Sequence, residues 1–261
     1  TLISSGGFIP VNNLSSIINT NTKEIVFSLT MLVSFFSIFL SYNLLFIRNK
    51  NISFFHEDIL LLIYFTTLLI FFYLLFNFDY NFSVILLSLV SSISNIGISL
   101  EQSPKNLSFI FLILIIIGGS FFSTSSGIRL LKLYALFKFS INNLISHVKP
   151  KNIFLNKHFF LNINFEKDEI SRYFLSVLIF IISLFILTSF LTISGISLES
   201  SFKLSILTLM NTVNSSMHGL GDFNFHELQS FTKYYLIFFM IIGRVELLTL
   251  LIICKKFLFK S

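Results

Sequence analysis

Five long apolar segments divide the chain, and each is long enough to cross a lipid bilayer. They occupy residues 25–47, 59–78, 106–128, 173–198 and 234–254. A membrane-spanning helix needs about 20 mostly apolar residues. Four of the segments contain no charged residue, and the last contains Arg244 and Glu246. The pattern predicts an all-α membrane protein with about five spans.

Two shorter apolar runs, 82–93 and 204–213, lie between these spans. Runs of this length are typical of re-entrant segments, which enter the membrane without crossing it. Each is followed by a short polar segment, 94–97 in the first case and 212–215 in the second. The order of span, short run, polar segment and span therefore occurs twice, and residues 1–47 read as the end of an earlier unit. Internal repeats of this kind predict span–pore helix–filter–span units around a central pore.

The polar segments have a chemistry that suits cation transport. Non-helical backbone is tolerated at membrane depth only where it is buried or lines water. Its carbonyl oxygens can replace the hydration shell of a potassium ion. Asn95 and Asn214 are interpreted as residues of such a filter, although asparagine in either place could equally form a turn.

Composition restricts the function classes further. Hydrophobic residues make up 54% of the 261 residues and charged residues 11%, with a mean hydropathy of +0.87. So few charges exclude a soluble enzyme, a disordered tail and a nucleic-acid module. The single Cys excludes a disulfide framework. No nucleophile–base pair, phosphate loop or paired-carboxylate arrangement is present, so an enzyme is not expected.

Basic residues orient the chain. The loops 48–58 and 129–172 and the C-terminus hold thirteen Lys and Arg residues, against four on the other side. This asymmetry places those loops in the cytoplasm. Six carboxylates, Glu24, Asp79, Glu101, Glu199, Asp222 and Glu227, then lie outside, where they favour cations or are simply solvated. A first span that starts outside without a signal sequence suggests an N-terminally truncated fragment.

Four sequence motifs resemble one transporter family. They are Ser4-Ser5-Gly6-Gly7-Phe8, Ser94-Asn95-Ile96-Gly97, the stretch from Gly118 to Arg129, and Gly243-Arg244-Val245-Glu246. In this order they resemble the Trk/Ktr/HKT cation transporter superfamily, and within it the TrkH type of potassium uptake protein. The resemblance covers essentially the whole chain. It implies a bacterial inner-membrane, multi-pass protein that carries potassium, with sodium as the alternative ion, and needs no other cofactor.

The resemblance also implies an assembly. The family's pore has four repeats in one chain, so residues 1–52 correspond to the end of repeat two, 53–150 to repeat three and 151–261 to repeat four. Members form homodimers and dock a cytosolic nucleotide-binding ring of the TrkA type. The lipid bilayer is the other expected partner, and nucleic acid is not one.

Site residues follow from the matched motifs. The potassium filter is expected at Ser4, Ser5, Gly6, Gly7, Ser94, Asn95, Ile96, Gly97, Thr212, Val213, Asn214 and Ser215. A flexible intramembrane loop that blocks the pore at rest is expected at Gly118, Gly119, Ser120, Ser123, Thr124 and Gly127, with Arg244 as its cationic partner. The alternatives are a non-selective sodium and potassium pathway, and a secondary transporter or scaffold subunit of another fold.

Two positions depart from the family pattern. Ser126 stands where the family has the first glycine of a Gly-Gly pair. Ser215 falls where a filter glycine is expected, counting back from Gly243, and Gly219 or Gly221 is the alternative equivalent if the loop is shifted. A serine that must adopt positive φ is strained, so potassium selectivity is the property that these departures affect.

Overall fold

The computed structural model describes most of the chain as helices. The described residues are 18, 20–36, 52–76, 80–100, 108–120, 123–148, 167–212, 216–220 and 223–245. The helices are α1 (Asn21–Phe35), α3 (Ile52–Phe76), α4 (Phe82–Ile93), α5 (Ser108–Ile116), α6 (Leu130–Val148), α7 (Lys167–Ile193), α8 (Leu198–Leu209) and α9 (Ser230–Val245). Two 3₁₀ turns, η4 (Ser216–His218) and η5 (Phe225–Glu227), lie between α8 and α9. The expectation of an all-α protein needs one correction, because the strands β1 (Ile117–Gly118) and β2 (Ile128–Arg129) pair with each other.

Two of the expected spans form single helices long and apolar enough to cross a membrane. They are Glu57–Leu75, within α3, and Lys167–Ile193, which is α7. Along α7 the buried residues form one stripe, Ser183, Leu184, Leu187, Thr188 and Leu191. Large apolar side chains such as Phe174 and Phe185 are exposed on its other faces. An apolar exposed surface of this extent fits contact with lipid.

The remaining three spans differ from single continuous helices or extend beyond the described residues. The segment 106–128 does not form one helix, because α5 ends at Ile116 and a loop separates it from α6. The segment 25–47 is described as far as residue 36, within and just after α1. The segment 234–254 is described to residue 245, the end of α9. The predicted span 106–128 is therefore interrupted at 118–127, where its glycines predicted a break.

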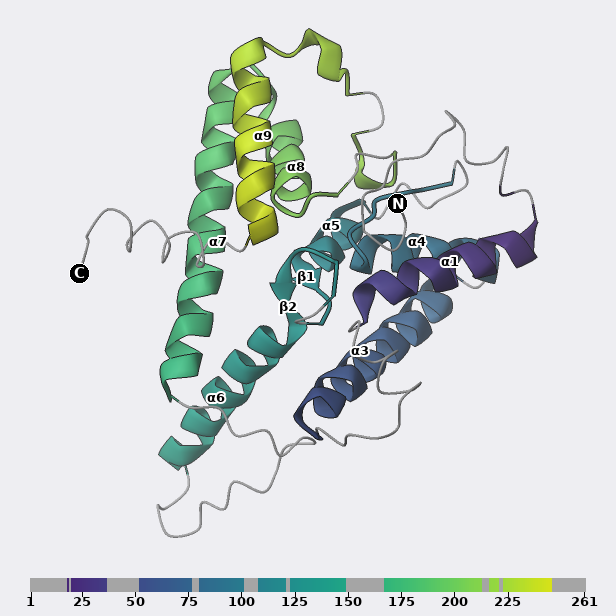
Figure 1. Cartoon of the computed structure of the whole chain (residues 1–261), viewed down its shortest axis with the longest axis vertical. Helices are drawn as coiled ribbons and strands as arrows, with labels where there is room; N and C mark the ends of the chain where they lie inside the picture. The colour runs from purple at the N-terminus through teal and green to yellow at the C-terminus, as the bar shows by residue number, and fades with distance from the viewer. Residues whose placement is uncertain are drawn as a thin grey trace.

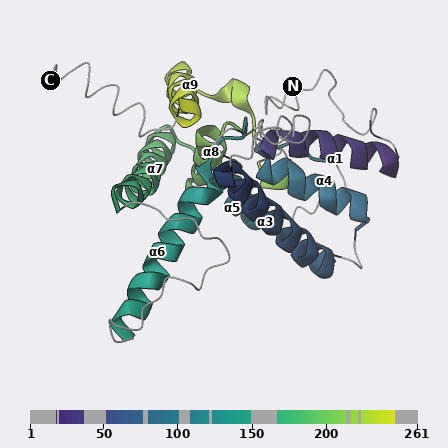
Figure 2. The ribbon, with the colours of Figure 1, turned by 60° about the horizontal axis from the view of Figure 1, so that its bottom comes forward.

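The helices form two groups that share α5. In Figures 1 and 2, α1, α3 and α4 lie on one side of α5, and α7, α8 and α9 lie on the other. Phe111 and Leu114 of α5 belong to the hydrophobic cluster of the first group. Leu112 and Ile115 belong to the cluster of the second group. The two faces of this short helix thus join both groups into one body.

The short helices α4 and α8 occupy corresponding places in the two groups. Each has 12 residues, and their first residues, Phe82 and Leu198, are 116 positions apart. Helix α4 packs against α1, α3 and α5, and α8 packs against α5, α7 and α9. Each therefore lies between the spans of its own unit and the last span of the unit before it. This is the arrangement that the repeated sequence pattern predicts.

The predicted boundary of the second short run was less accurate than that of the first. The run 82–93 matches α4, whereas α8 begins six residues before the expected 204 and ends four before 213. The early start has a local cause. Ser197 caps the helix by accepting a bond from the Ser200 amide, and Lys203 forms an ion pair of 2.6 Å with Glu199 across one turn. Such i,i+4 ion pairs stabilise a helix, so α8 includes the polar residues that precede the apolar run.

Candidate functional site

The segment that follows α4 is buried and has an unusual backbone. Asn95 has φ 58° and Gly97 has φ 77°. The Ser91 hydroxyl donates a 2.5 Å hydrogen bond to the Ile98 carbonyl, which turns the chain back beside the helix. Among the described residues, no hydrogen bond ends on a backbone carbonyl of residues 94–97. Buried carbonyls are nearly always paired, so this segment has acceptors that suit a ligand.

The end of α8 repeats the same backbone pattern. The Asn95 amide donates to the Ser92 carbonyl, and the Asn211 amide donates to the Thr208 carbonyl, both at 3.2 Å. The next amides, of Ile96 and Thr212, donate to the carbonyls of Ser91 and Leu207. Asn211 also has positive φ, at 52°. The match shows that Asn211 is the counterpart of Asn95.

This register differs from the one expected for the last filter segment. The sequence interpretation paired Asn95 with Asn214 and used residues 212–215. The repeat of 116 positions instead pairs 94–97 with 210–213, which adds Met210 and Asn211 as candidates. Thr212 is described and buried, while Val213, Asn214 and Ser215 lie outside the described residues, as do Ser4, Ser5, Gly6 and Gly7. Their assignment to the filter stays a prediction.

Each asparagine side chain forms a hydrogen bond that connects the end of its helix to a later part of the chain. The Asn95 side-chain amide donates a 2.7 Å bond to the Ser126 carbonyl, 31 residues ahead. The Asn211 side-chain amide donates a 2.9 Å bond to the Met240 carbonyl in α9, 29 residues ahead. Asparagine suits both tasks, because it tolerates the left-handed conformation and carries a donor.

Replacing Asn95 therefore tests two separate contributions to stability, the side-chain hydrogen bond and the left-handed backbone conformation. We expect Asn95→Gly to lower the free energy of unfolding by about 1 kcal/mol, the net value of one hydrogen bond. Asn95→Ala also forces a residue with Cβ into the left-handed region, which costs about 1–2 kcal/mol more. Thermal unfolding of the full-length protein in detergent should rank wild type above Gly and Gly above Ala. Equal melting temperatures for the two variants would contradict the backbone argument.

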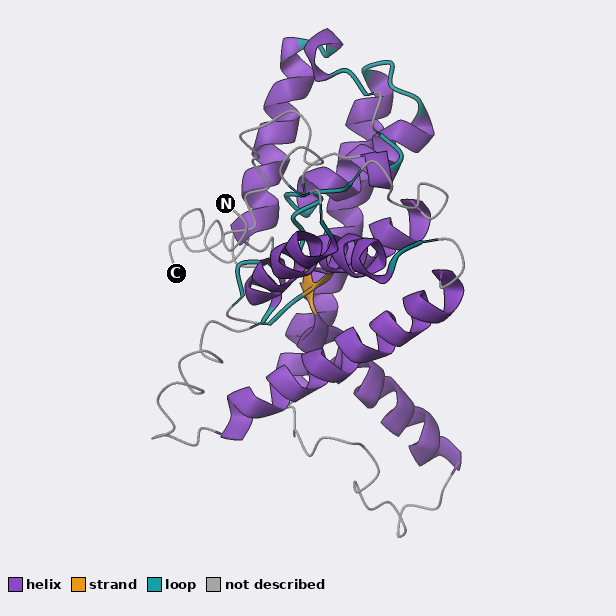
Figure 3. Ribbon diagram, turned by 90° about the vertical axis from the view of Figure 1, so that its right-hand side faces the viewer, coloured by secondary structure: helices purple, strands orange, loops and turns teal. Residues whose placement is uncertain are grey.

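The loop between α5 and α6 folds back on itself inside the helical body. Ile117 pairs with Ile128 and Gly118 with Arg129 in a parallel register, and the pair lies among the helices in Figure 3. The loop rests on the end of α1. The Ser120 amide donates to the Phe35 carbonyl at 3.1 Å, and the Ser125 amide donates to the Ser34 carbonyl at 3.3 Å. These bonds satisfy carbonyls that the helix end leaves without partners.

The loop glycines are required by close backbone contacts. A Cβ on Gly118 would collide with the Ser126 carbonyl oxygen, and a Cβ on Gly119 would collide with that of Phe35. Gly127 has φ 101°, a conformation that L side chains rarely adopt. The glycines thus allow the loop to pack in this compact form.

Arg129 holds the loop in place, and the sequence interpretation missed it. Its guanidinium donates to the carbonyls of Ser120 and Ser125, both at 2.8 Å, and to the Ser123 hydroxyl at 3.0 Å. The sequence interpretation assigned the cationic partner to Arg244, whose side chain is exposed at the end of α9; that assignment stays a prediction. The available signal was a basic residue directly after the glycine-bracketed stretch.

Ser126 is not strained in the way its motif position suggests. Among the described residues, the non-glycine residues with positive φ are Asn95 and Asn211. Gly127 alone takes the left-handed turn of the Ser126-Gly127 pair. The Ser126 hydroxyl donates to the Met210 carbonyl at the end of α8. The Ser126 side chain therefore makes a hydrogen bond to α8 that a glycine at this position could not make.

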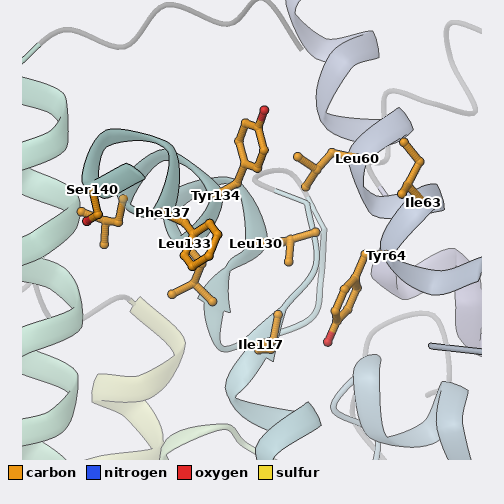
Figure 4. Close-up of a pocket in the computed structure, with 10 residues that line it drawn as sticks. Leu60, Ile63, Tyr64, Ile117, Leu130, Leu133, Tyr134, Phe137 and Ser140 are labelled. Carbon is orange, nitrogen blue, oxygen red and sulfur yellow. The ribbon is translucent and has the colours of Figure 1, made fainter. Parts of the chain in front are cut away.

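An apolar cavity of about 730 Å³ lies beside the loop, between α3 and α6. Figure 4 shows Leu60, Ile63 and Tyr64 on the α3 side and residues of α6 opposite. Ile117 of β1 and Leu130, which follows β2, line the end next to the loop. The strand pair thus borders a space that apolar side chains can enter.

His218, between α8 and α9, is a buried histidine. It is 0% exposed and lies in η4, which packs against α5. Burial lowers the pKa of His218 to about 4, so the side chain is neutral near pH 7. Among the described members of the six carboxylates predicted to lie outside, one is buried and one is paired with a lysine. Glu24 is buried, and the Lys203 ammonium lowers the pKa of the Glu199 carboxyl through a hydrogen bond and charge attraction.

Comparisons with known proteins give a family and a similar fold. A family model described as TrkH, cation transport protein, matches residues 98–259. The solved structure of the potassium transporter TrkH from Vibrio parahaemolyticus is similar over 97% of this chain, with a TM-score of 0.73 and 20% sequence identity. This chain spans 56% of the length of that protein. A comparison with curated protein sequences gave no match.

Proposed function

The chain belongs to the TrkH family of cation transport proteins, and from this premise we propose that it forms part of a potassium-uptake pathway. The family consists of ion transporters and not enzymes. Its membership places the chain in a membrane. We propose further that the protein is a multi-pass protein of the bacterial inner membrane.

The proposed filter consists of the backbone following each short helix. The observation that carries this proposal is the buried segment 94–97, whose carbonyls accept no hydrogen bond from the described residues. The side-chain oxygen of Asn95 is also buried without a hydrogen-bond partner among the described residues. Carbonyl oxygens replace the hydration shell of potassium in filters of this kind. The matching backbone of 210–212 supports a second filter segment at the end of α8.

A complete pore needs further segments. By the sequence pattern, residues 4–7 supply a third filter segment, and the family's fourfold pore requires a fourth from the remainder of the protein. The boundaries proposed for the units are 1–52, 53–150 and 151–261. We also propose that the protein forms a homodimer and binds a cytosolic nucleotide-binding ring.

The proposed gate is the loop 118–127. Its bonds to α1 and to Arg129 hold it in one compact form. Opening requires these contacts to break and the strand pair to move, and the adjacent apolar cavity offers space for Ile117 and Leu130. Arg244 remains proposed as a positive charge that opposes cation flow near the end of α9.

Complementation tests the transport function. The full-length gene is expressed in a bacterium that lacks its potassium-uptake systems, and growth at limiting potassium is measured together with uptake of radioactive rubidium. We expect growth and uptake. Absence of both, with the protein present in the membrane, would contradict potassium transport.

A non-selective sodium and potassium pathway is the second candidate. The repeat of 116 positions pairs Gly97, which has φ 77°, with Val213. A β-branched residue rarely adopts positive φ, so the last filter segment need not copy the first. Competition of sodium against rubidium uptake distinguishes the two candidates, because a selective filter resists a large sodium excess.

A further inference from the structure

Ser126 joins the loop to both described filter segments, through its backbone carbonyl on one side and its hydroxyl on the other. The side-chain amide of Asn95 donates to the Ser126 backbone carbonyl at 2.7 Å, and the Ser126 hydroxyl donates to the Met210 carbonyl. Asn95 follows α4, Ser126 lies in the loop, and Met210 caps α8. Asn95, Ser126 and Met210 are all buried, with exposed fractions of 0%, 6% and 2%. We call this chain of contacts the Ser126 bridge.

We propose that the Ser126 bridge couples the position of the gate loop to the geometry of the filter, so that Ser126 is a positioning residue for both. This inference rests on the filter and gate proposed above. The bridge connects two repeats that also pack against each other through α5, through α6 against α7, and through Met217 of η4. A movement of the loop must release the Met210 carbonyl, the Asn95 amide, or both.

The serine hydroxyl is the group that connects the loop to the second of the two repeats. A glycine at position 126 would keep the carbonyl that accepts from Asn95 but would have no donor for Met210. The loop would then be tied to the filter segment of one repeat alone. The Ser126 carbonyl also lies against Gly118, so the bridge is attached to the strand pair that must move when the loop opens.

Removal of the hydroxyl should favour the open loop. One net hydrogen bond in a buried site corresponds to about a fivefold change in an equilibrium. We therefore expect Ser126→Ala and Ser126→Gly to raise the open fraction of the loop about fivefold. Ser126→Thr retains the hydroxyl and should stay closer to wild type. Because the Met210 carbonyl loses the Ser126 hydroxyl and keeps only the longer bond from the Thr212 hydroxyl, the preference for rubidium over sodium should change in the same two variants.

The test uses the full-length protein and a readout that does not depend on transport. Thr124→Cys, in a background with Cys254→Ser, reports loop opening through its rate of modification by a water-soluble thiol reagent. We expect Ser126→Ala and Ser126→Gly to accelerate modification about fivefold. The matched control is Ser183→Ala, since the Ser183 hydroxyl donates to Phe180 within α7; this change should leave the rate unaltered.

The outcomes separate this inference from the proposed function. Unchanged modification and unchanged ion preference in the two Ser126 variants, in a protein whose wild type supports rubidium uptake, would overturn the coupling alone. An altered modification rate without altered ion preference would restrict Ser126 to the gate and would also overturn the coupling. A wild type without uptake would overturn the transport proposal, while the modification rates would still report the bridge. Both Ala and Gly are used because either one could impair folding, and the melting temperature identifies such a variant.

Discussion

Replacing Arg129 with glutamine is expected to raise passive rubidium flux through the full-length protein at least about tenfold. The guanidinium donates three hydrogen bonds to the loop, two of them to backbone carbonyls. A hydrogen bond to a charged group contributes about 1.5–3 kcal/mol, so the loss of one such bond already accounts for a tenfold change. All three bonds come from one nitrogen, Nη1, and glutamine, which is shorter and neutral, does not place a charged donor there. Flux into proteoliposomes measures the effect.

Two further variants define the cause. Arg129→Lys retains the charge but not the forked donors, and we expect an intermediate flux. Arg172→Gln removes an exposed arginine of α7, far from the loop in sequence, and should not change the flux. If Arg129→Gln and Arg172→Gln gave the same flux as wild type, Arg129 would have only a local structural role.

The second large effect is expected for Gly119→Ala. The new Cβ would occupy the position of the Phe35 carbonyl oxygen, which is backbone and cannot rotate away. The compact loop would have to separate from α1 and lose the bond from Ser120 to Phe35. We expect a flux increase of about tenfold, the result of shifting the loop equilibrium by about 1.4 kcal/mol, measured by the same rubidium assay.

Gly195→Ala is the matched control for this substitution. A Cβ on Gly195 has no atom within 4 Å, although the residue has φ 93°. The variant therefore introduces backbone strain of about 1–2 kcal/mol without a collision. It should lower the melting temperature and leave the flux unchanged. A decrease in flux for Gly119→Ala would show that the loop observed in this structure is not the blocking form.

The sequence predicted the helices well where long apolar runs define them. The segments 59–78 and 173–198 lie largely within α3 and α7, and the run 82–93 is α4. The break in the third span was also predictable, because Gly118, Gly119 and Gly127 surround polar residues there. Lipid selects long apolar runs strongly, and few other structures satisfy the backbone in a membrane. These features are therefore visible in a single sequence.

The contacts of the site were less accessible from the sequence. The register of the last filter segment depends on where α8 ends, and an asparagine three residues later offered an equally good match. The role of Arg129 depends on a loop that turns back toward it, which spacing along the chain does not reveal. The Ser126 bridge joins residues 84 positions apart. Long-range side-chain contacts of this kind require the fold itself.

We propose that the backbone after α4 forms part of a cation filter. The most direct test is a crystal structure of the full-length protein soaked with rubidium or thallium, in which the ion is located by its anomalous scattering. We predict an anomalous peak in coordinating distance of the carbonyl oxygens of residues 95–97, and a loss of that peak when sodium replaces the heavier ion. A protein that transports rubidium but has its anomalous peaks away from residues 94–97 and 210–213 would contradict the claim.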